Sequence, residues 1–356
     1  MHIGQPCYSS SDRKVSIVHH FGPDPDTVGG MATVIRNLTE NDVGADVVDF
    51  HASWSPRSRS TTTGMALTAT RALLQMPVTH VAHVHLSERG SFLREGGLLA
   101  LASGRGIVSV ATIHGASFEP FARRYPLLVS AVLRRAHAIT CLDQGTLEVV
   151  RRSAPRVHSE VLPNPVLTDD TVSPADRTAE LVVFAGEIGR RKGADVLHRA
   201  WQLVSRRRPE ARCLMVGPVT DFDPPPFQRL EVWPSVDSSY MRDILRRARV
   251  VALPSRAEAS PMILLEAMSL GRPFVGTPVG GIPELAADGG MLAPVGDEKG
   301  LADRLTELLA DPHLARTVGE HGRQFCQATR SVEVVDALLR RLYSEARADG
   351  AKSNWT

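Results

Sequence analysis

Short apolar runs alternate with helix-forming segments along almost the whole chain, and this alternation constrains the fold more than any other feature. In the first half the expected strands are 15–18, 45–50, 79–86, 106–113, 138–142 and 159–162. The alternation restarts with expected strands at 181–185, 211–216, 250–253 and 274–276. Strands that alternate with helices predict α/β domains with doubly wound parallel sheets.

The length of 356 residues is enough for two domains of ordinary size. Between Val166 and Ala179 the chain becomes polar, and we place an interdomain linker there. The predicted organisation is a first domain at 1–166, a linker at 167–179 and a second domain at 180–331.

The composition excludes several classes of protein. Apolar residues make up 43% of the chain, which is normal for a globular core, and the net charge of +2 gives no nucleic-acid footprint. The four cysteines are scattered, which argues against a zinc knuckle or a disulfide framework and fits a reducing compartment. Met1 to Lys14 lack the apolar stretch of a secretion signal. We therefore expect a cytoplasmic protein.

The most informative segment runs from the strand at 250–253 into a helix expected over Met262 to Leu270. Glu258 lies in the small-residue turn between them, and Glu266 lies about one turn inside the helix. In parallel α/β sheets, ligands bind where strand ends meet helix N-termini. The N–H groups of the first helical turn lack intrahelical partners and form an anion site. One loop thus offers two carboxylates for hydroxyl groups and a cradle for phosphate, which suits a nucleotide sugar.

The sequence after this helix completes a recognisable unit. Apolar neighbours make the helix mostly buried, so a charged Glu266 needs a partner. A further short strand then ends in the Gly280-Gly281 turn, which opens another helix. Taken together, 250–285 resembles the donor-site signature of the retaining GT-B glycosyltransferases of family four, the glycosyl transferases group 1.

This resemblance implies a GT-B fold, in which two doubly wound Rossmann-like domains face an interdomain cleft. The domain at 1–166 would meet the acceptor, and the domain at 180–331 would bind the nucleotide sugar. The last helix, about 332–348, would pack back on the first domain. The implied reaction is transfer of a sugar from a nucleotide donor with retained anomeric configuration.

A glycine-rich segment after the strand at 181–185 forms a second candidate part of the site. Gly186 lets the backbone approach a ligand, and Lys192 lies at a loop-to-helix junction, where an ammonium can meet a diphosphate. The family pattern has an Arg after the first glycine and a Lys five residues further on. Lys192 matches, but the Arg position holds Glu187, and we expect Arg190 or Arg191 to compensate. A solvated basic turn is the alternative interpretation.

The first strand-to-helix turn contains Gly29 and Gly30 and resembles the Gly-Gly loop that closes over donor and acceptor in this family. Two Asp-x-Asp triplets, 24–26 and 221–223, are similar to a metal-binding motif of the other major glycosyltransferase fold. Neither lies in a suitable context, so we interpret both as loops and predict that no metal is required.

His114 ends the central strand at 106–113, where the crevice of the sheet lies. The family has a His in this place that faces the donor sugar, although an isolated His is more often structural. The turn at 163–165 resembles the Pro-Asn turn that enters the interdomain linker, which is a structural role.

Two arginine pairs flank an apolar core between Phe118 and Arg135. The pattern favours one buried helix with a basic exposed face. Contact with an inner-membrane surface is the alternative, because many relatives glycosylate lipid-linked acceptors.

The resemblance assigns roles to single residues. Lys192, an Arg beside it and the helix N-terminus would neutralise the leaving diphosphate, Glu266 would hold the ribose, and Glu258 would lie near the sugar ring. The predicted catalytic residues are Glu258, His114 and Lys192. The predicted donor-binding residues are Gly29, Gly30, Gly186, Arg191, Lys192, Ser260, Met262, Ile263 and Glu266.

The predicted enzyme is a hexosyl- or N-acetylhexosaminyltransferase that uses a UDP-linked or GDP-linked donor. Its acceptor is a hydroxyl of a glycan, a lipid-linked sugar or a small molecule. A non-enzymatic nucleotide-sugar-binding partner subunit and a UDP-sugar 2-epimerase of the same fold remain as alternatives. A nicotinamide enzyme is disfavoured, because no Gly-x-Gly-x-x-Gly follows any expected strand.

Overall fold

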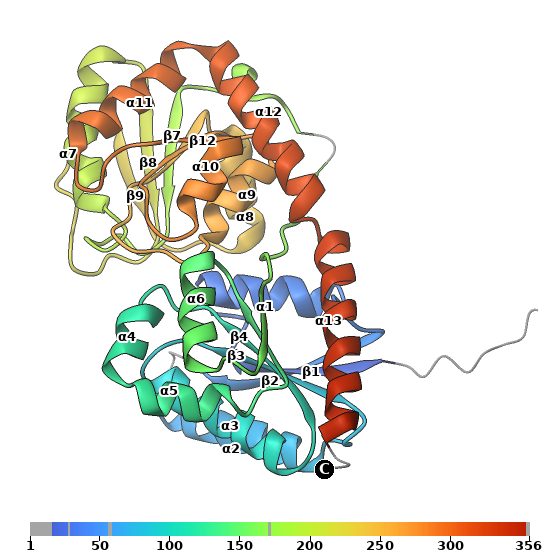
Figure 1. Cartoon of the computed structure of the whole chain (residues 1–356). Helices are drawn as coiled ribbons and strands as arrows, with labels where there is room; N and C mark the ends of the chain where they lie inside the picture. The colour runs from blue at the N-terminus through green and yellow to red at the C-terminus, as the bar shows by residue number, and fades with distance from the viewer. Residues whose placement is uncertain (1–15, 28, 56–58, 170–171, 354–356) are drawn as a thin grey trace, which may run out of the picture.

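The computed structural model describes residues 16–27, 29–55, 59–169 and 172–353. The segment in which we expect no secretion signal lies outside these described residues. The molecule consists of two α/β units stacked one above the other (Figure 1). A search of the described residues found no helix that is long and apolar enough to cross a membrane.

The N-terminal unit contains a six-stranded parallel sheet in the order β2-β1-β3-β4-β5-β6. The strands are β1 (Ile17–Pro23), β2 (Val47–Trp54), β3 (Val81–Leu86), β4 (Val108–Ile113), β5 (Ala138–Cys141) and β6 (His158–Val161). The helices are α1 (Gly30–Glu40), α2 (Arg59–Gln75), α3 (Gly90–Gly104), α4 (Phe118–Arg124), α5 (Pro126–Leu133) and α6 (Gln144–Ser153). The side chains of β3 are all buried, as expected for a central parallel strand that is covered on both faces.

The C-terminal unit repeats this plan with a second six-stranded parallel sheet, in the order β12-β11-β10-β7-β8-β9. Its strands are β7 (Leu181–Ala185), β8 (Arg212–Val216), β9 (Leu230–Trp233), β10 (Val250–Leu253), β11 (Phe274–Gly276) and β12 (Gly290–Leu292). Its helices are α7 (Ala194–Arg207), α8 (Ser238–Arg247), α9 (Met262–Ser269), α10 (Ile282–Gly289), α11 (Glu298–Ala310) and α12 (Pro312–Thr329). The predicted fold class, two doubly wound parallel sheets, is confirmed.

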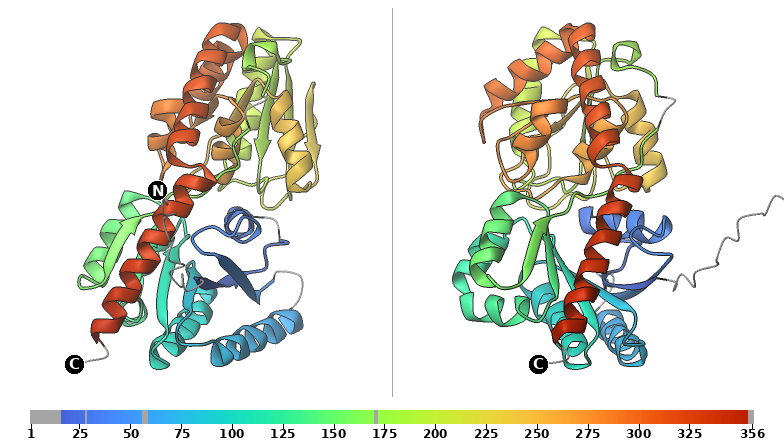
Figure 2. Two further views of the ribbon diagram at one scale, coloured as in Figure 1. Left: turned by 90° about the vertical axis from the view of Figure 1, so that its right-hand side faces the viewer. Right: turned by 45° about the vertical axis from the view of Figure 1, so that its right-hand side comes forward.

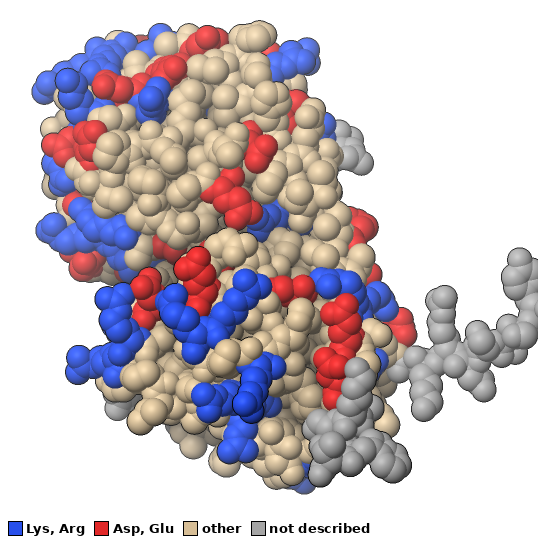
Figure 3. Space-filling view, in the orientation of Figure 1, with Lys and Arg blue, Asp and Glu red and all other residues tan. Residues whose placement is uncertain are grey.

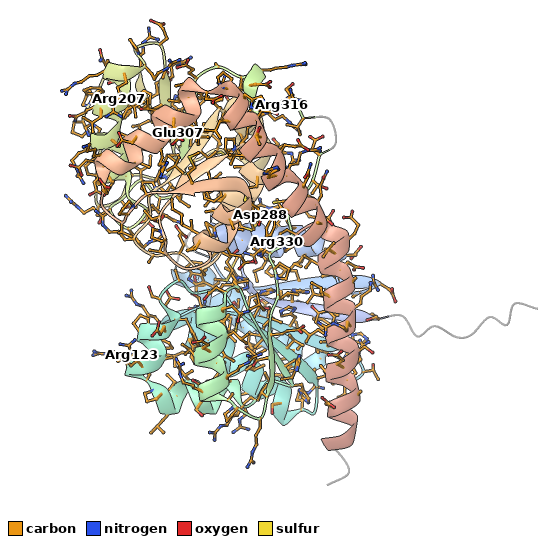
Figure 4. All side chains as sticks on the ribbon, turned by 45° about the horizontal axis from the view of Figure 1, so that its top comes forward. Arg123, Arg207, Asp288, Glu307, Arg316 and Arg330 are labelled. Atoms are coloured by element: carbon orange, nitrogen blue, oxygen red, sulfur yellow. The ribbon has the colours of Figure 1, made fainter. Side chains whose placement is uncertain are left out.

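The chain passes between the two units at two adjacent places. Val166 leaves the first unit and forms an isolated bridge with Ser331, where α12 ends. Figure 4 labels Arg330 at this junction, and its guanidinium lies 2.5 Å from the Glu284 carboxylate of α10. The last helix, α13 (Val332–Ser353), then runs down the first unit, as both views in Figure 2 show. Its Tyr343 hydroxyl lies 2.6 Å from His83 Nδ1, inside the N-terminal core.

Three features of the structure were not predicted from the sequence. The segment 118–135 forms two helices instead of one, because Pro126 begins α5 and cannot continue α4. Strands β9 and β12 were not predicted, since they are only four and three residues long and are not strongly apolar. The expected linker contains a short 3-10 turn, Ala175–Arg177.

Candidate functional site

The predicted site residues lie around a cleft between the two units. The cleft has a volume of about 900 Å³ and lies at the carboxyl ends of both sheets. Its walls include all of the candidate residues: Gly29, Gly30, His114, Gly186, Arg191, Lys192, Glu258, Ser260, Met262, Ile263 and Glu266. A smaller cavity of about 150 Å³ lies beside Trp233 and Tyr240, and none of the candidate residues lines it.

Two loops of the C-terminal unit are fastened to each other by Arg256. Its guanidinium donates two hydrogen bonds to the Asp195 carboxylate, at 2.8 and 2.9 Å. It also donates to the carbonyl oxygen of Arg190, and its own backbone N–H donates to the carbonyl of Arg191. The charge of Arg256 and these hydrogen bonds keep the pKa of Asp195 below its usual range despite burial. The loop after β10 and the loop after β7 therefore form one rigid wall of the cleft.

Lys192 and Glu258, predicted separately, contact each other on this wall. Lys192 Nζ lies 2.5 Å from Glu258 Oε1, and only 16% and 6% of the two side chains are exposed. The Ser255 hydroxyl donates to the same carboxylate oxygen at 2.7 Å. The ammonium group is thus held at the cleft surface by a buried carboxylate.

Glu187, the departure from the family pattern, has one partner in its own loop and one in the loop after β8. Its carboxylate accepts hydrogen bonds from Arg191 at 3.0 Å and from the Thr220 hydroxyl at 3.1 Å. The guanidinium that we expected to replace the missing family Arg is therefore paired with the residue that stands in its place.

The N-terminus of α9 opens toward the cleft. Pro261 precedes the helix, and no side chain caps it, so N–H groups of the first turn remain available to a ligand. The Glu258 loop is held against this end by the Gly280-Gly281 turn. Gly280 has a φ of 52°, and a Cβ there would lie 1.8 Å from the carbonyl oxygen of Glu258. Only glycine satisfies both constraints.

Glu266 lies on α9 and faces the cleft. Burial raises its pKa to about 7, and the charges of Arg242 on α8 and Arg36 on α1 oppose this rise. Two arginines, one from each unit, thus favour the charged form of Glu266 electrostatically, but burial outweighs them. Sequence reasoning missed both, because nothing in the local pattern links them to α9.

The Gly29-Gly30 turn lies across the cleft from α9. Gly29 has a φ of 152° and begins α1 without a side-chain cap. A Cβ built on Gly30 would lie 4.0 Å from Met262 Cγ, so the N-termini of α1 and α9 approach each other across the cleft. Asn164 also crosses this junction and donates to the carbonyl of Ser260 at 3.3 Å.

His114 forms the N-terminal wall of the cleft together with two residues that sequence reasoning missed, Ser87 and Glu88. His114 is half-buried, and burial lowers its pKa to about 3. Glu88 lies over the residue that follows, since a Cβ on Gly115 would lie 1.8 Å from the Glu88 carboxylate. The only sequence signal for Glu88 was its position just after the end of a central strand.

Both Asp-x-Asp triplets accept hydrogen bonds from backbone N–H groups of loops. Asp24 Oδ1 accepts from the N–H of Asp26 at 3.0 Å, and Asp221 Oδ1 accepts from the N–H of Arg190 at 2.8 Å. The expectation that catalysis needs no metal stays a prediction.

Part of the chain is similar in sequence to known glycosyltransferases. Residues 179–311, within the C-terminal unit, match the family model of the glycosyl transferases group 1. Over 161 residues the chain is 31% identical to D-inositol 3-phosphate glycosyltransferase of Segniliparus rotundus, and the aligned segment covers 41% of this chain and 36% of that protein. Over 110 residues it is 38% identical to N-acetyl-alpha-D-glucosaminyl L-malate synthase of Bacillus anthracis, covering 30% and 29%. The chain therefore matches about a third of the length of these two relatives.

Solved structures match the whole fold. Sucrose-phosphate synthase from Thermosynechococcus elongatus superposes with a TM-score of 0.72 at 18% identity, covering 94% of this chain and 100% of that one. HepE of Anabaena, solved with UDP and glucose, superposes with a TM-score of 0.71 at 15% identity, covering 92% and 99%. The GT-B architecture implied by the donor-site signature is confirmed.

Proposed function

We propose that this protein transfers a sugar from a nucleotide-sugar donor to an acceptor hydroxyl, with retention of anomeric configuration and without a metal ion. The observation that carries the proposal is the convergence of Lys192, the open N-terminus of α9 and Glu266 on one cleft. A nucleotide sugar needs a cation and N–H donors at its diphosphate and a carboxylate at its ribose, and these groups must lie close enough for one ligand to contact all of them.

Each group has a chemical task in this proposal. The departing diphosphate gains negative charge, which Lys192 and the first-turn N–H groups of Met262 and Ile263 would stabilise electrostatically. The Glu266 carboxylate would accept hydrogen bonds from the ribose hydroxyls. Glu258 holds Lys192 in place and lies where the sugar ring would pass. The acceptor would attack from the side of the leaving phosphate, which would take up the acceptor's proton.

The donor class is proposed on the names of related proteins. HepE is described with UDP and UDP-glucose, and a pneumococcal O-GlcNAc transferase of similar fold with UDP and GlcNAc. We therefore propose a UDP-linked hexose or N-acetylhexosamine as donor. The relatives named for inositol 3-phosphate and L-malate support a small-molecule acceptor, and a glycan or lipid-linked acceptor would use the same cleft.

Peripheral contact with an anionic membrane is proposed for the α4–α5 region. Leu127 is 85% exposed at the start of α5, and Arg123 and Arg124 end α4 beside it. Figure 3 shows Lys and Arg side chains gathered on the face that carries α4, α5 and α6, and Figure 4 labels Arg123 at its outer edge. If this face binds membranes, Leu127→Asp reduces co-sedimentation with anionic vesicles, whereas Leu67→Asp on α2 does not.

The function is tested with a panel of nucleotide sugars in thermal-shift and transfer assays. A bound donor raises the melting temperature according to its affinity. The anomeric configuration of the product, read by NMR, tests retention, and turnover after exhaustive chelation tests metal independence. Tight donor binding without transfer or hydrolysis would indicate a binding subunit instead, and isomerisation of the donor without acceptor would indicate an epimerase.

A further inference from the structure

A row of three histidines leads from the cleft into the core of the N-terminal unit. His114 Nε2 lies 2.8 Å from His85 Nδ1, and His85 Nε2 lies 2.8 Å from His20 Nδ1. His20 and His85 lie on the neighbouring strands β1 and β3, His114 directly follows β4, and of the three only His114 lines the cleft. We call His114, His85 and His20 the histidine row.

Each ring of the histidine row carries a single N–H. Burial lowers the pKa of His114 and of His20 to about 3, and it holds the pKa of His85 well below its usual value. At neutral pH all three rings are therefore uncharged, and a neutral imidazole has one donor nitrogen and one acceptor nitrogen.

Counting protons leaves two arrangements for the histidine row. If His85 carries its proton on Nδ1, it donates to His114 and accepts from His20, so the proton of His114 is on Nδ1. If His85 carries its proton on Nε2, both links reverse, so His114 donates through Nε2 and His20 carries its proton on its own Nε2.

The inner end of the row distinguishes the two arrangements. His20 Nε2 is buried and has no hydrogen-bond partner among the described residues. Buried N–H groups without an acceptor are rare, whereas buried acceptors without a donor are tolerated more often. The arrangement that leaves His20 Nε2 unprotonated is therefore the stable one. At the outer end, the proton of His114 then lies on Nδ1, which has no partner among the described residues and, unlike His20 Nε2, is not a buried unpaired atom.

We propose that His85 and His20 are positioning residues that fix the tautomer of His114, so that His114 presents a permanent Nδ1–H donor to an oxygen atom of the bound sugar. This role rests on the proposed transferase function. It makes His114 a neutral hydrogen-bond donor and not a general base, and it gives the two inner histidines a task although neither reaches the cleft.

The same region does not have the geometry of a metal site. His20, His83 and His85 have ring nitrogens close together, but the His83 ring stacks on His85 and is tilted over His20, with centroids 4.6 Å apart in both pairs. A metal lies in the plane of each imidazole that binds it, so stacked rings do not direct their lone pairs to one point. Both nitrogens of His83 are also occupied, by Tyr343 and Thr112.

The tautomer is measured directly in the wild-type protein by long-range ¹H–¹⁵N correlation NMR. The signals of His114 are assigned by their loss in His114→Gln. We expect a protonated Nδ1 and an unprotonated Nε2. A proton on Nε2 of His114 in the folded wild-type protein overturns the proposal, and this measurement needs neither substrate nor a core variant.

The positioning role is tested with His85→Leu. The change removes both hydrogen bonds of the row, so His114 populates both tautomers and its Nδ1–H signal weakens. Because less of the protein then carries the donor at Nδ1, kcat/KM for transfer falls. Losing one neutral hydrogen bond to the sugar corresponds to a decrease on the order of two- to twelvefold. A matched control is His19→Leu, because His19 links His51 and His80 in a similar row on the other face of β1.

The outcomes separate this proposal from the proposed function. If His19→Leu changes the His114 signals as much as His85→Leu does, the effect is a general disturbance of the sheet and the proposal fails. If the wild-type protein transfers sugar but carries the proton of His114 on Nε2, only the proposal fails. If no donor is bound or transferred, the proposed function fails, whatever tautomer is found.

Discussion

The two walls of the cleft are built on different principles. The C-terminal wall is made of charges: Lys192 with Glu258, Arg256 with Asp195, and Glu266 near two arginines. The facing part of the N-terminal wall is centred on His114, whose buried row is uncharged. A ligand that carries a diphosphate at one end and a sugar at the other would meet Lys192 and a helix N-terminus on one side and, on the other, the neutral His114 beside Ser87 and Glu88.

This difference suggests a division of labour. Charged groups in a partly buried wall stabilise charge that develops on the leaving group. Neutral donors fixed in one orientation recognise hydroxyl groups without adding a charge of their own. A single substitution that affects one wall and not the other tests this division.

The largest expected effect is that of Lys192→Ala. If Lys192 stabilises the leaving diphosphate, its contribution is greater in the transition state than in the ground state. We expect kcat to fall by about 100-fold or more, the scale of losing one preorganised electrostatic contact. Single-turnover kinetics measure it.

A second variant separates this effect from damage to the wall. Lys192→Ala leaves Glu258 buried without its cation, which by itself destabilises the loop. The double variant Lys192→Ala/Glu258→Gln removes this unpaired buried charge. Activity close to wild type in the double variant would contradict a direct role for Lys192 at the diphosphate.

Glu266→Ala comes next and tests the ribose contact. Removing a charged hydrogen-bond partner typically costs about 1.5–3 kcal/mol, so the affinity for the nucleoside diphosphate alone should fall by a corresponding factor. Calorimetry measures it, with Glu298→Ala on α11 as a control outside the cleft. Unchanged affinity in a folded Glu266→Ala variant would remove this residue from the site.

The pH dependence of the same binding is a smaller effect. Burial raises the pKa of Glu266 to about 7 in the free protein, so the side chain is largely protonated at pH 6 and largely ionised at pH 8. Because the carboxylate is the form that accepts from two ribose hydroxyls, affinity should rise with pH, by at most about tenfold per unit for one proton. The diphosphate ionises in the same pH range, so the slope of affinity against pH is compared with that of Glu266→Gln, in which only the diphosphate titrates. Equal slopes for both proteins would contradict the assignment.

The two walls also differ in how well the sequence predicted them. The parts contributed by 250–285 were predictable, because strand, turn and helix N-terminus are contiguous in sequence and place Glu258 and Glu266 by local geometry. The pairing of Lys192 with Glu258 was not, since it depends on the register between loops that are 66 residues apart. The charge of Arg36 acts on Glu266 from the other unit, which no local pattern indicates.

The histidine row shows the same limit on the N-terminal wall. The alternation of His83 and His85 in an expected strand placed both side chains on one face of the sheet. It could not show that His20 would lie on that face and His19 on the other, because this depends on where β1 pairs with β3. Pairing between strands 65 residues apart in sequence therefore decides which histidines are hydrogen-bonded to each other.

The smallest expected effect is that of Glu187→Gln, which tests whether the charged wall is complete without the family Arg. Glu187 and Arg191 are partly exposed, and such ion pairs contribute about 0–1 kcal/mol. The substitution releases Arg191 toward the cleft without placing a new charge there, so kcat should stay within a few-fold of wild type. Glu187→Arg restores the family residue, adds a cation near Lys192 and should tighten nucleotide binding. Calorimetry measures the nucleotide affinity and single-turnover kinetics measure kcat. Together they decide whether this loop binds the diphosphate or is a solvated basic turn. If Glu187→Gln abolishes transfer while Lys192→Ala is nearly normal, Glu187 itself acts on the substrate, and the assignment of charge stabilisation to Lys192 is wrong.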